Sequence, residues 1–307
     1  MAYTLKEMKA LYPNDPMRQR LIDNFLDGSE SVILPMLSFV DSSDALAYNF
    51  VSEDNLGEIG ERSLNGEYDV SADSSSPKRE VLSLFGGAIR TDNVFIDAKG
   101  DVARLNKIDR RMRAAGKYFD RQFFLGDSKA NAKQFAGLRA RSVARERILW
   151  AGTNGGALTL DLLDEALDSV SGENGSKVIF CDRWMRRKVS SLCRSSTNAK
   201  FEFDDRRQLQ AYDGAVIKTI SEDHKRNPIF TFTEERGTSK VTGSLYVARF
   251  GGSVDEDHLQ GIKGPSFMKL RSPVNMGEYV KDVIDNVLGL VDFTDNCFMR
   301  IGGILKQ

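Results

Sequence analysis

The chain has 307 residues, 41% of them hydrophobic and 28% charged, a composition that predicts a folded protein of one to three domains with a sizeable core. Its formal net charge of −1 excludes a global attraction to nucleic acid or acidic membranes, and no apolar run approaches the roughly 18 residues of a transmembrane helix. Two histidines, and three cysteines without metal-ligand spacing, disfavour histidine catalysis, histidine-rich metal sites and a disulfide framework.

The first predicted element is a helix within residues 15–28. Asp15 is a good N-cap, Pro16 suits the first helical position, and Gly28 suits the stop. An apolar run, 31–40, follows it. A helix followed by such a run is typical of an arm that packs on another subunit, but a strand that covers the chain's own core fits about equally well.

The next segment predicts a long two-stranded excursion. Residues 45–51 alternate in polarity like a strand, and 80–97 predict a returning strand with a bulge or bend at Gly86–Gly87. The intervening residues 52–78 are polar, rich in Gly, Ser and Asp, and longer than a hairpin turn requires. We therefore expect this excursion not to pack on its own domain.

The strongest helical pattern lies at 101–124, where apolar residues recur with a period near 3.6. A third helix is predicted from the cap residue Thr159 to Val170. Further strands and helices follow in alternation: a buried strand at 177–181, a basic helix at 183–194 capped by Asp182, and strand-like runs at 211–220, 228–234 and 244–252. Residues 278–293 fit both periods, but their β-branched side chains favour a strand.

Four carboxylates fall within the helix predicted at 159–170, and Asp161, Glu165 and Asp168 share one face at helical spacing, with Asp164 beside them. Such a face raises the question of an acid/base or metal site. No histidine stands at ligand spacing, and the apolar positions already explain an amphipathic helix, so we predict a solvated or salt-bridged face. Asp168 lies late in the helix, where the dipole disfavours it. The basic helix 183–194, of the same subunit or a neighbour, is the natural partner.

Other chemical candidates are weaker. The segment 251–261, with His258, is acidic but lacks the spacing of an EF-hand calcium loop. The basic stretches 110–121 and 182–194 can contact nucleic acid but are more often solvated helix faces. Cys181 has no evident base to make it a nucleophile. There is no phosphate loop, dinucleotide fingerprint or nucleophile elbow, so the sequence predicts no catalytic residue, metal ligand or cofactor.

The order of elements carries a resemblance to a known family. The segments that carry it are "FFLGD", "QFAGL", "GGALTLDLLDEALDSV" with "GSKVIFCDRWMRRKV", "AYDGAVIKTI", "SLYVARFGG" and "LQGIKG". In pattern and order, over about 101–307, they resemble the major capsid proteins of tailed bacteriophages with the HK97-type fold. No single motif is diagnostic, and 155–194 and 212–251 carry most of the specificity.

The resemblance implies an α+β capsid fold divided into five parts. These are an N-terminal arm at 1–43, an extended loop at 44–97, a peripheral domain with a long spine helix at 98–149, an axial domain at 150–262, and return strands of the peripheral domain at 263–307. In the family the extended loop lies on an adjacent subunit, and the resemblance implies the same for the arm. The resemblance also implies that the acidic face of the helix at 159–170 is an exposed surface or a contact between subunits.

The implied function is structural, not enzymatic: self-assembly into an icosahedral shell that encloses phage double-stranded DNA. The shell would be assembled in the host cytoplasm and form the virion capsid. The implied partners are further copies in pentamers and hexamers, a portal, a separate scaffolding protein since no scaffolding segment of about a hundred residues precedes the extended loop, and no membrane. Decoration proteins are an open option, and contact with packaged DNA would be non-specific, through local patches such as Arg110, Arg111 and Arg113.

Two alternatives remain. A bacterial encapsulin has the same fold and encloses a cargo enzyme, and genome neighbours would separate it from a phage protein. A hydrolytic or metal enzyme would use the acidic cluster. Some capsid relatives cross-link a lysine of the extended loop to an asparagine of the next subunit. We expect no such bond between Lys78 and Asn296, because Lys78 lies in a polar setting. Its neighbour Pro77 suggests a turn at the tip of the loop.

Overall fold

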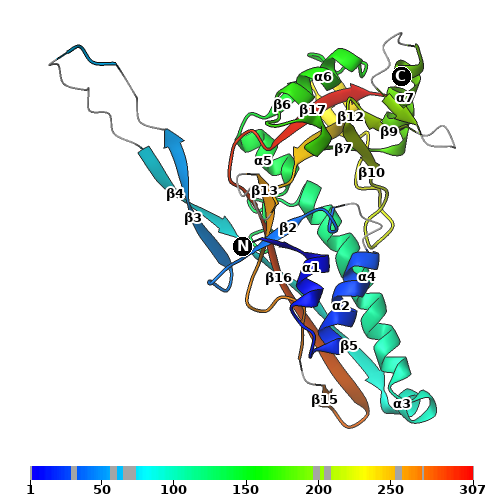
Figure 1. The fold of residues 1–307 in the computed structure, drawn as a ribbon. Coiled ribbons are helices and arrows are strands. Elements are labelled where there is room, and N and C mark those ends of the chain that lie inside the picture. The colour runs from blue at the N-terminus through cyan, green and yellow to red at the C-terminus, as the bar shows by residue number, and fades with distance from the viewer. Residues whose placement is uncertain are drawn as a thin grey trace.

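The computed structural model describes residues 2–28, 33–55, 61–64, 74–195, 201–203, 209–252, 258–271 and 273–306. Within these residues the chain forms an upper eight-stranded sheet, a lower seven-stranded sheet and a separate two-stranded hairpin (Figure 1). The lower sheet and a long helix extend away from the upper unit, and the hairpin projects to one side (Figure 1). The mixture of helices and antiparallel sheets confirms the α+β class.

The lower sheet is built around β16 (Tyr279–Asp292), so the segment with two possible periods is a strand, as predicted. β16 pairs antiparallel with β5 (Ser83–Asp92) over ten residues and with β13 (Leu259–Lys263) at its end. The sheet is completed by short strands: β1 (Tyr3–Thr4), β2 (Ser38–Asp41), β14 (Lys269–Leu270) and β15 (Val274–Asn275).

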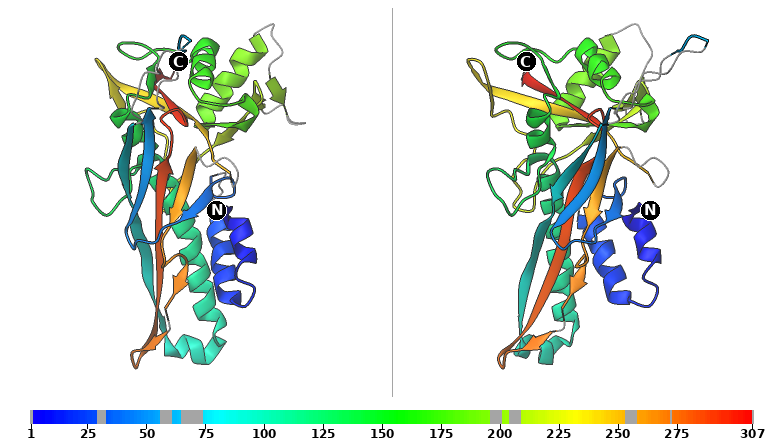
Figure 2. Two further views of the ribbon diagram at one scale, coloured as in Figure 1. Left: turned by 60° about the vertical axis from the view of Figure 1, so that its left-hand side comes forward. Right: turned by 90° about the vertical axis from the view of Figure 1, so that its left-hand side faces the viewer.

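The helices of the lower unit pack in a layer beside this sheet (Figure 2). They are α1 (Leu5–Ala10), α2 (Pro16–Gly28), α3 (Asn93–Lys99) and α4 (Val102–Leu125), and α4 is the long helix predicted from its period. The rings of Phe25 in α2 and Phe119 in α4 meet edge to face, with centroids 6.2 Å apart. α2 ends at Gly28, as predicted. A glycine is required at this position because a Cβ would overlap the backbone of Arg113.

The N-terminal segment packs on its own chain, which is the second of the two arrangements that the sequence left open. Leu21, Phe25, Leu34 and Phe39 are fully buried in the same core as α4. β2 pairs with β13 in parallel, so the segment is also hydrogen-bonded into the lower sheet. The expectation of an arm that crosses to a neighbour is therefore wrong for the described part of 1–43, because its apolar residues already have a core.

The segment 80–97 differs from the single returning strand that was expected. β4 (Ser74–Val81) pairs with β3 (Ala47–Asn55) in the projecting hairpin, and the chain then enters the lower sheet as β5. No register shift marks Gly86–Gly87, where β5 pairs regularly with β16. Gly86 lies so close to the Ile284 carbonyl that a Cβ would overlap it, which explains the glycine without a bulge. Residues from Asn93 are helical, because Asp92 caps α3.

The upper sheet runs in the order β6-β17-β12-β7-β10-β9-β8, with β11 beside β12. Its strands are β6 (Ile148–Trp150), β7 (Lys177–Cys181), β8 (Phe201–Phe203), β9 (Leu209–Tyr212), β10 (Ala215–Thr219), β11 (Glu234–Arg236), β12 (Ser239–Arg249) and β17 (Phe298–Leu305). Two helices pack on it through one buried cluster, α6 (Leu160–Asp168) and α7 (Arg183–Ser195). Both were predicted, and Thr159 caps α6 as expected.

Two expectations for the upper unit are corrected. β17 pairs with β12 and β6, so the last strand belongs to the upper sheet and only β16 and its neighbours return to the lower one. Residues 228–233 form no strand, and β11 begins at Glu234. Phe230 instead stacks on Tyr246 and meets Phe124 edge to face, so this apolar run fills the core from a loop. The division into peripheral and axial domains otherwise stays a prediction.

Candidate assembly surfaces

The acidic face of α6 is exposed, as predicted. Asp161, Glu165 and Asp168 face solvent, whereas Asp164 is half-buried and accepts a hydrogen bond of 2.7 Å from the Tyr212 hydroxyl. Burial raises the pKa of Tyr212, and the bond to Asp164 adds to that shift. The three exposed carboxylates therefore form a solvated face with no buried acid–base pair among them.

The predicted partner of this face, α7 of the same chain, does not pair with it. Over the described lengths of both helices no ion pair joins α6 to α7. Asp168 lies nearer Lys177 of β7: burial lowers the pKa of the Lys177 ammonium and Asp168 partly offsets that shift. Lys177 also donates to the Leu167 carbonyl at 2.7 Å. Pairing with a neighbouring subunit's α7 stays a prediction.

Replacing Asp161, Glu165 and Asp168 together with asparagine is expected to change the free energy of unfolding by less than about 1 kcal/mol, because exposed charges contribute little. Asp164→Ala is the contrasting variant: it strands the Tyr212 hydroxyl and should cost about 1–3 kcal/mol. Denaturant unfolding of both variants measures the difference. A larger loss in the triple variant than in Asp164→Ala would contradict this reading of the face.

The remaining polar candidates do not gather into a reactive site. Cys181, Cys193 and Cys297 are buried, and burial raises the pKa of the Cys181 and Cys297 thiols to about 12. His224 lies against the Tyr118 ring, with centroids 5.4 Å apart. The acidic part of the loop before His258, 253–257, lies outside the described residues. Among described residues, no three His, Cys, Asp or Glu side chains are grouped to hold a metal ion.

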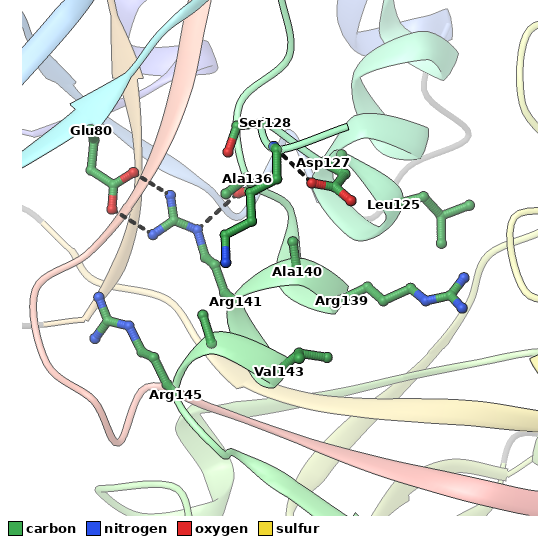
Figure 3. A pocket seen from close by; sticks show the side chains of 13 residues that line it. Glu80, Leu125, Asp127, Ser128, Ala136, Arg139, Ala140, Arg141, Val143 and Arg145 are labelled. Atoms are coloured by element: carbon green, nitrogen blue, oxygen red, sulfur yellow. Dashed lines mark hydrogen bonds and ion pairs between the residues drawn. The ribbon is translucent and has the colours of Figure 1, made fainter. Parts of the chain in front are cut away.

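A buried arginine holds the base of the projecting hairpin (Figure 3). Arg141, in α5 (Leu138–Ala144), makes two bonds of 2.7 Å to the Glu80 carboxylate of β4. It also pairs with Asp292 at the end of β16 and donates at 2.8 Å to the Leu290 carbonyl. One side chain thus joins the hairpin, α5 and the lower sheet. We call Glu80, Arg141 and Asp292 the arginine junction.

The junction is shielded and closely balanced in charge. The Arg141 side chain is 5% exposed and that of Asp292 is fully buried. A second cation, Arg145, lies 3.0 Å from Asp292 and also pairs with Asp295. Burial raises the pKa of Asp292 against the opposing effect of the two arginines. An open pocket of about 520 Å³ lies beside the junction, between α5 and the loop after α4.

The sequence reasoning missed this junction, although a signal for it exists. Asp292 ends the continuous apolar run of β16, where an acid at a buried position requires a cation. Arg141 lies three residues after Leu138, on the inward face of α5. The identity of the partner could not be read from the sequence, because Glu80, Arg141 and Asp292 are brought together only by the tertiary fold.

Apolar side chains are exposed at the hairpin and at the far end of the lower sheet. Val51 on β3 is 65% exposed, and Leu46, which directly precedes β3, is 51% exposed. At the far end, exposed side chains come from α3, the start of α4 and the β15 turn: Val94, Phe95, Val102, Val274 and Met276. These places are candidate contact surfaces, since exposed apolar groups gather at protein interfaces. In the described parts of the chain, no helix has the length and apolar character to cross a membrane.

The cross-linking candidates come from different elements of the fold. Pro77 and Lys78 are inside β4, opposite Val51 and Phe50, so the turn expected at Pro77 is not there. Asn296 follows the lower sheet, and its carbonyl accepts from Ser171. The two carboxylates near it, Asp292 and Asp295, are both paired with arginines. The absence of a bond between subunits stays a prediction.

Comparison with solved structures places the fold. The chain is similar to the capsid of a native GTA particle, with a TM-score of 0.60, 10% identity and 88% of each chain covered. It is similar to the cyanophage A-1(L) capsid, with a TM-score of 0.57, 14% identity, and 88% of this chain and 92% of that chain covered. It also resembles the SrpI encapsulin of Synechococcus elongatus PCC 7942, with a TM-score of 0.55, 13% identity, and coverage of 76% and 78%.

Sequence comparison adds no relative. No protein-family model matches the chain, and no curated protein matches it. The likeness therefore rests on three-dimensional structure at low identity, and it extends through both sheets because most of each chain is covered. The chain has the HK97-type fold, the α+β architecture that these capsid and encapsulin subunits share.

Proposed function

We propose that this chain is a major capsid protein that assembles into an icosahedral shell around phage double-stranded DNA. The observation that carries the proposal is the β3–β4 hairpin, which projects from a body of HK97-type fold (Figure 1). Among the described residues of the hairpin, the aromatic contacts with the rest of the chain lie at its base, where Tyr48 and Phe50 pack against Phe293. An exposed β-ribbon with exposed apolar side chains is stable only if something covers it, and in a shell a neighbouring subunit does.

The proposal includes the following partners. The chain would associate with further copies in pentamers and hexamers, with a portal and a scaffolding protein, and without specificity with packaged DNA. It would assemble in the host cytoplasm and end in the virion capsid. We propose no enzymatic role, which is supported by the solvated acidic face of α6 and by the structural role of the shells that the fold resembles.

An encapsulin shell enclosing a cargo enzyme is the second candidate, because the SrpI encapsulin has the same fold. The capsids are favoured by TM-score, which is 0.60 for the GTA capsid and 0.57 for the cyanophage capsid, against 0.55 for the encapsulin. Genes for terminase, portal and tail beside this gene would support a phage capsid. A neighbouring ferritin-like or peroxidase gene would support an encapsulin.

Shell formation should depend on the hairpin. Deleting residues 53–75 and joining the paired residues Ser52 and Ser76 with Asn-Gly, which favours a tight hairpin turn, is expected to leave a folded subunit that no longer assembles. The base contacts of Phe50 and Glu80 are kept, so folding should be spared. Electron microscopy and light scattering measure assembly, with and without a scaffolding protein.

The matched control is Leu11→Ala, which removes exposed apolar surface far from the hairpin. It should assemble as the unaltered chain does. Normal shells from the shortened hairpin, or a monomer from the unaltered chain under all conditions, would contradict the proposal.

A further inference from the structure

An open groove of about 360 Å³ runs between α4 and β5 and is lined by four cationic side chains. Arg90 comes from β5, and Lys107, Arg110 and Arg111 come from α4. Small side chains, Ala88 and Ala114, lie between them. None of the described residues that line the groove is acidic. We call this feature the basic groove.

The cations of the groove are positioned by the fold. The Lys107 ammonium donates to the Arg90 carbonyl at 3.0 Å and lies 5.9 Å from the centre of the Phe95 ring. The Arg90 guanidinium lies 5.0 Å from the centre of the Tyr279 ring. Gly87 leaves room for Arg111, because a Cβ there would lie 3.3 Å from the Arg111 Cδ and Nε. Part of the cost of ordering these side chains is therefore met before any ligand binds.

Two acids near these cations are paired with other arginines. Asp109 of α4 binds Arg20 through bonds of 2.9 and 2.6 Å, on the side of α4 that faces α2. Asp282 of β16 is fully buried and binds Arg104 at 2.8 Å. Neither carboxylate lines the groove, whose described lining is cationic and apolar on a chain of net charge −1.

We propose that the basic groove binds the phosphodiester backbone of the enclosed duplex. The inference rests on the proposed function for the presence of DNA, but its chemistry comes from the groove. Arginine, which supplies three of the four cations, matches phosphate oxygens with two parallel donors. Lys107 and Arg111 are one helical turn apart, about 6 Å along the axis, a span that successive phosphates can bridge.

The lining also predicts which part of the nucleic acid is contacted. It offers no aromatic ring to stack on a base and no asparagine or glutamine to read a base edge. Contact is therefore with phosphates alone, so binding is independent of sequence and weakens with salt.

The test compares Arg110→Gln/Arg111→Gln with Arg183→Gln/Arg187→Gln, which removes the same charge from the exposed surface of α7. Fluorescence anisotropy of a short mixed-sequence duplex is measured on purified unassembled chain from about 50 to about 200 mM salt. The groove variant is expected to reduce the slope of log K against log salt by about 2, and the α7 variant to leave it unchanged. Inorganic phosphate should compete only weakly with the duplex, because a single phosphate ion cannot contact several cations of the groove through linked phosphates as the duplex does.

Three results would overturn the proposal. If the salt-dependence slope fell equally in both variants, only the net charge of the chain would matter for binding. If the unaltered chain did not bind the duplex, the groove would not be a binding site for DNA. Failure of the groove variant to form shells without DNA, where the unaltered chain forms them, would make the groove a contact between copies. Failure of the unaltered chain itself to assemble would count against the proposed function, while the binding slopes still decide the groove.

Discussion

Arg141→Ala is expected to lower the free energy of unfolding by about 3–5 kcal/mol, because it leaves the buried Asp292 carboxylate and the Glu80 carboxylate without their main cation. Two carbonyl oxygens, of Ala136 and Leu290, also lose a donor. Denaturant unfolding of the unassembled chain measures the loss. Arg139→Ala is the matched control on the same helix: its side chain is 48% exposed and its nearest carboxylate oxygen lies 3.9 Å away, so the loss should be below about 1 kcal/mol.

The deficit of Arg141→Ala should also depend on pH. Burial already raises the pKa of Asp292, and removing Arg141 raises it further. The folded state then binds a proton more tightly than the unfolded state, so the stability tied to Asp292 is present at acidic pH and is lost as pH rises through the folded pKa. The difference between the variant and the unaltered chain should be smaller at about pH 5 than at about pH 8. A deficit that grows on acidification would contradict this account.

Phe25→Ala is expected to cost about 3–5 kcal/mol in the unassembled chain, because Phe25 is fully buried against Phe119 of α4. This result tests whether the N-terminal segment belongs to its own core. Leu11→Ala, at a position 51% exposed in the same segment, should change stability by less than about 0.5 kcal/mol. If Phe25→Ala left the monomer unchanged and weakened only the shells, the segment would pack on a neighbour after all.

The elements with strong local signals were predictable from the sequence. The period of α4, the Thr159 cap of α6, the helix stop at Gly28 and the β-branched residues of β16 all act within a few residues of the chain, and the structure has each of them. The length and polarity of 52–78 also indicated a projecting excursion. The resemblance in the order of elements then gave the fold, which structural similarity confirms.

The errors share one physical cause, which is that the destination of an apolar segment is a property of the whole fold. The run at 31–40 and the run at 228–234 are equally compatible with a strand, an arm or a core filler. Phe39 reaches the lower core through β2, and Phe230 packs on Tyr246 from a loop. From its sequence, β17 could likewise belong to either sheet, and only its pairing with β12 places it in the upper sheet.

By itself, the sequence determined the helices α2, α4, α6 and α7, the strands β7, β12 and β16, and the acidic face of α6, because these depend on spacing and residue type. Only the tertiary structure decided that Arg141 joins Glu80 to Asp292, that the N-terminal segment stays on its own chain, and that Arg90 of β5 meets Arg111 of α4 in one groove. Each of these depends on residues separated by tens to hundreds of positions, whose distance is set by packing and strand pairing and by no local preference of the chain.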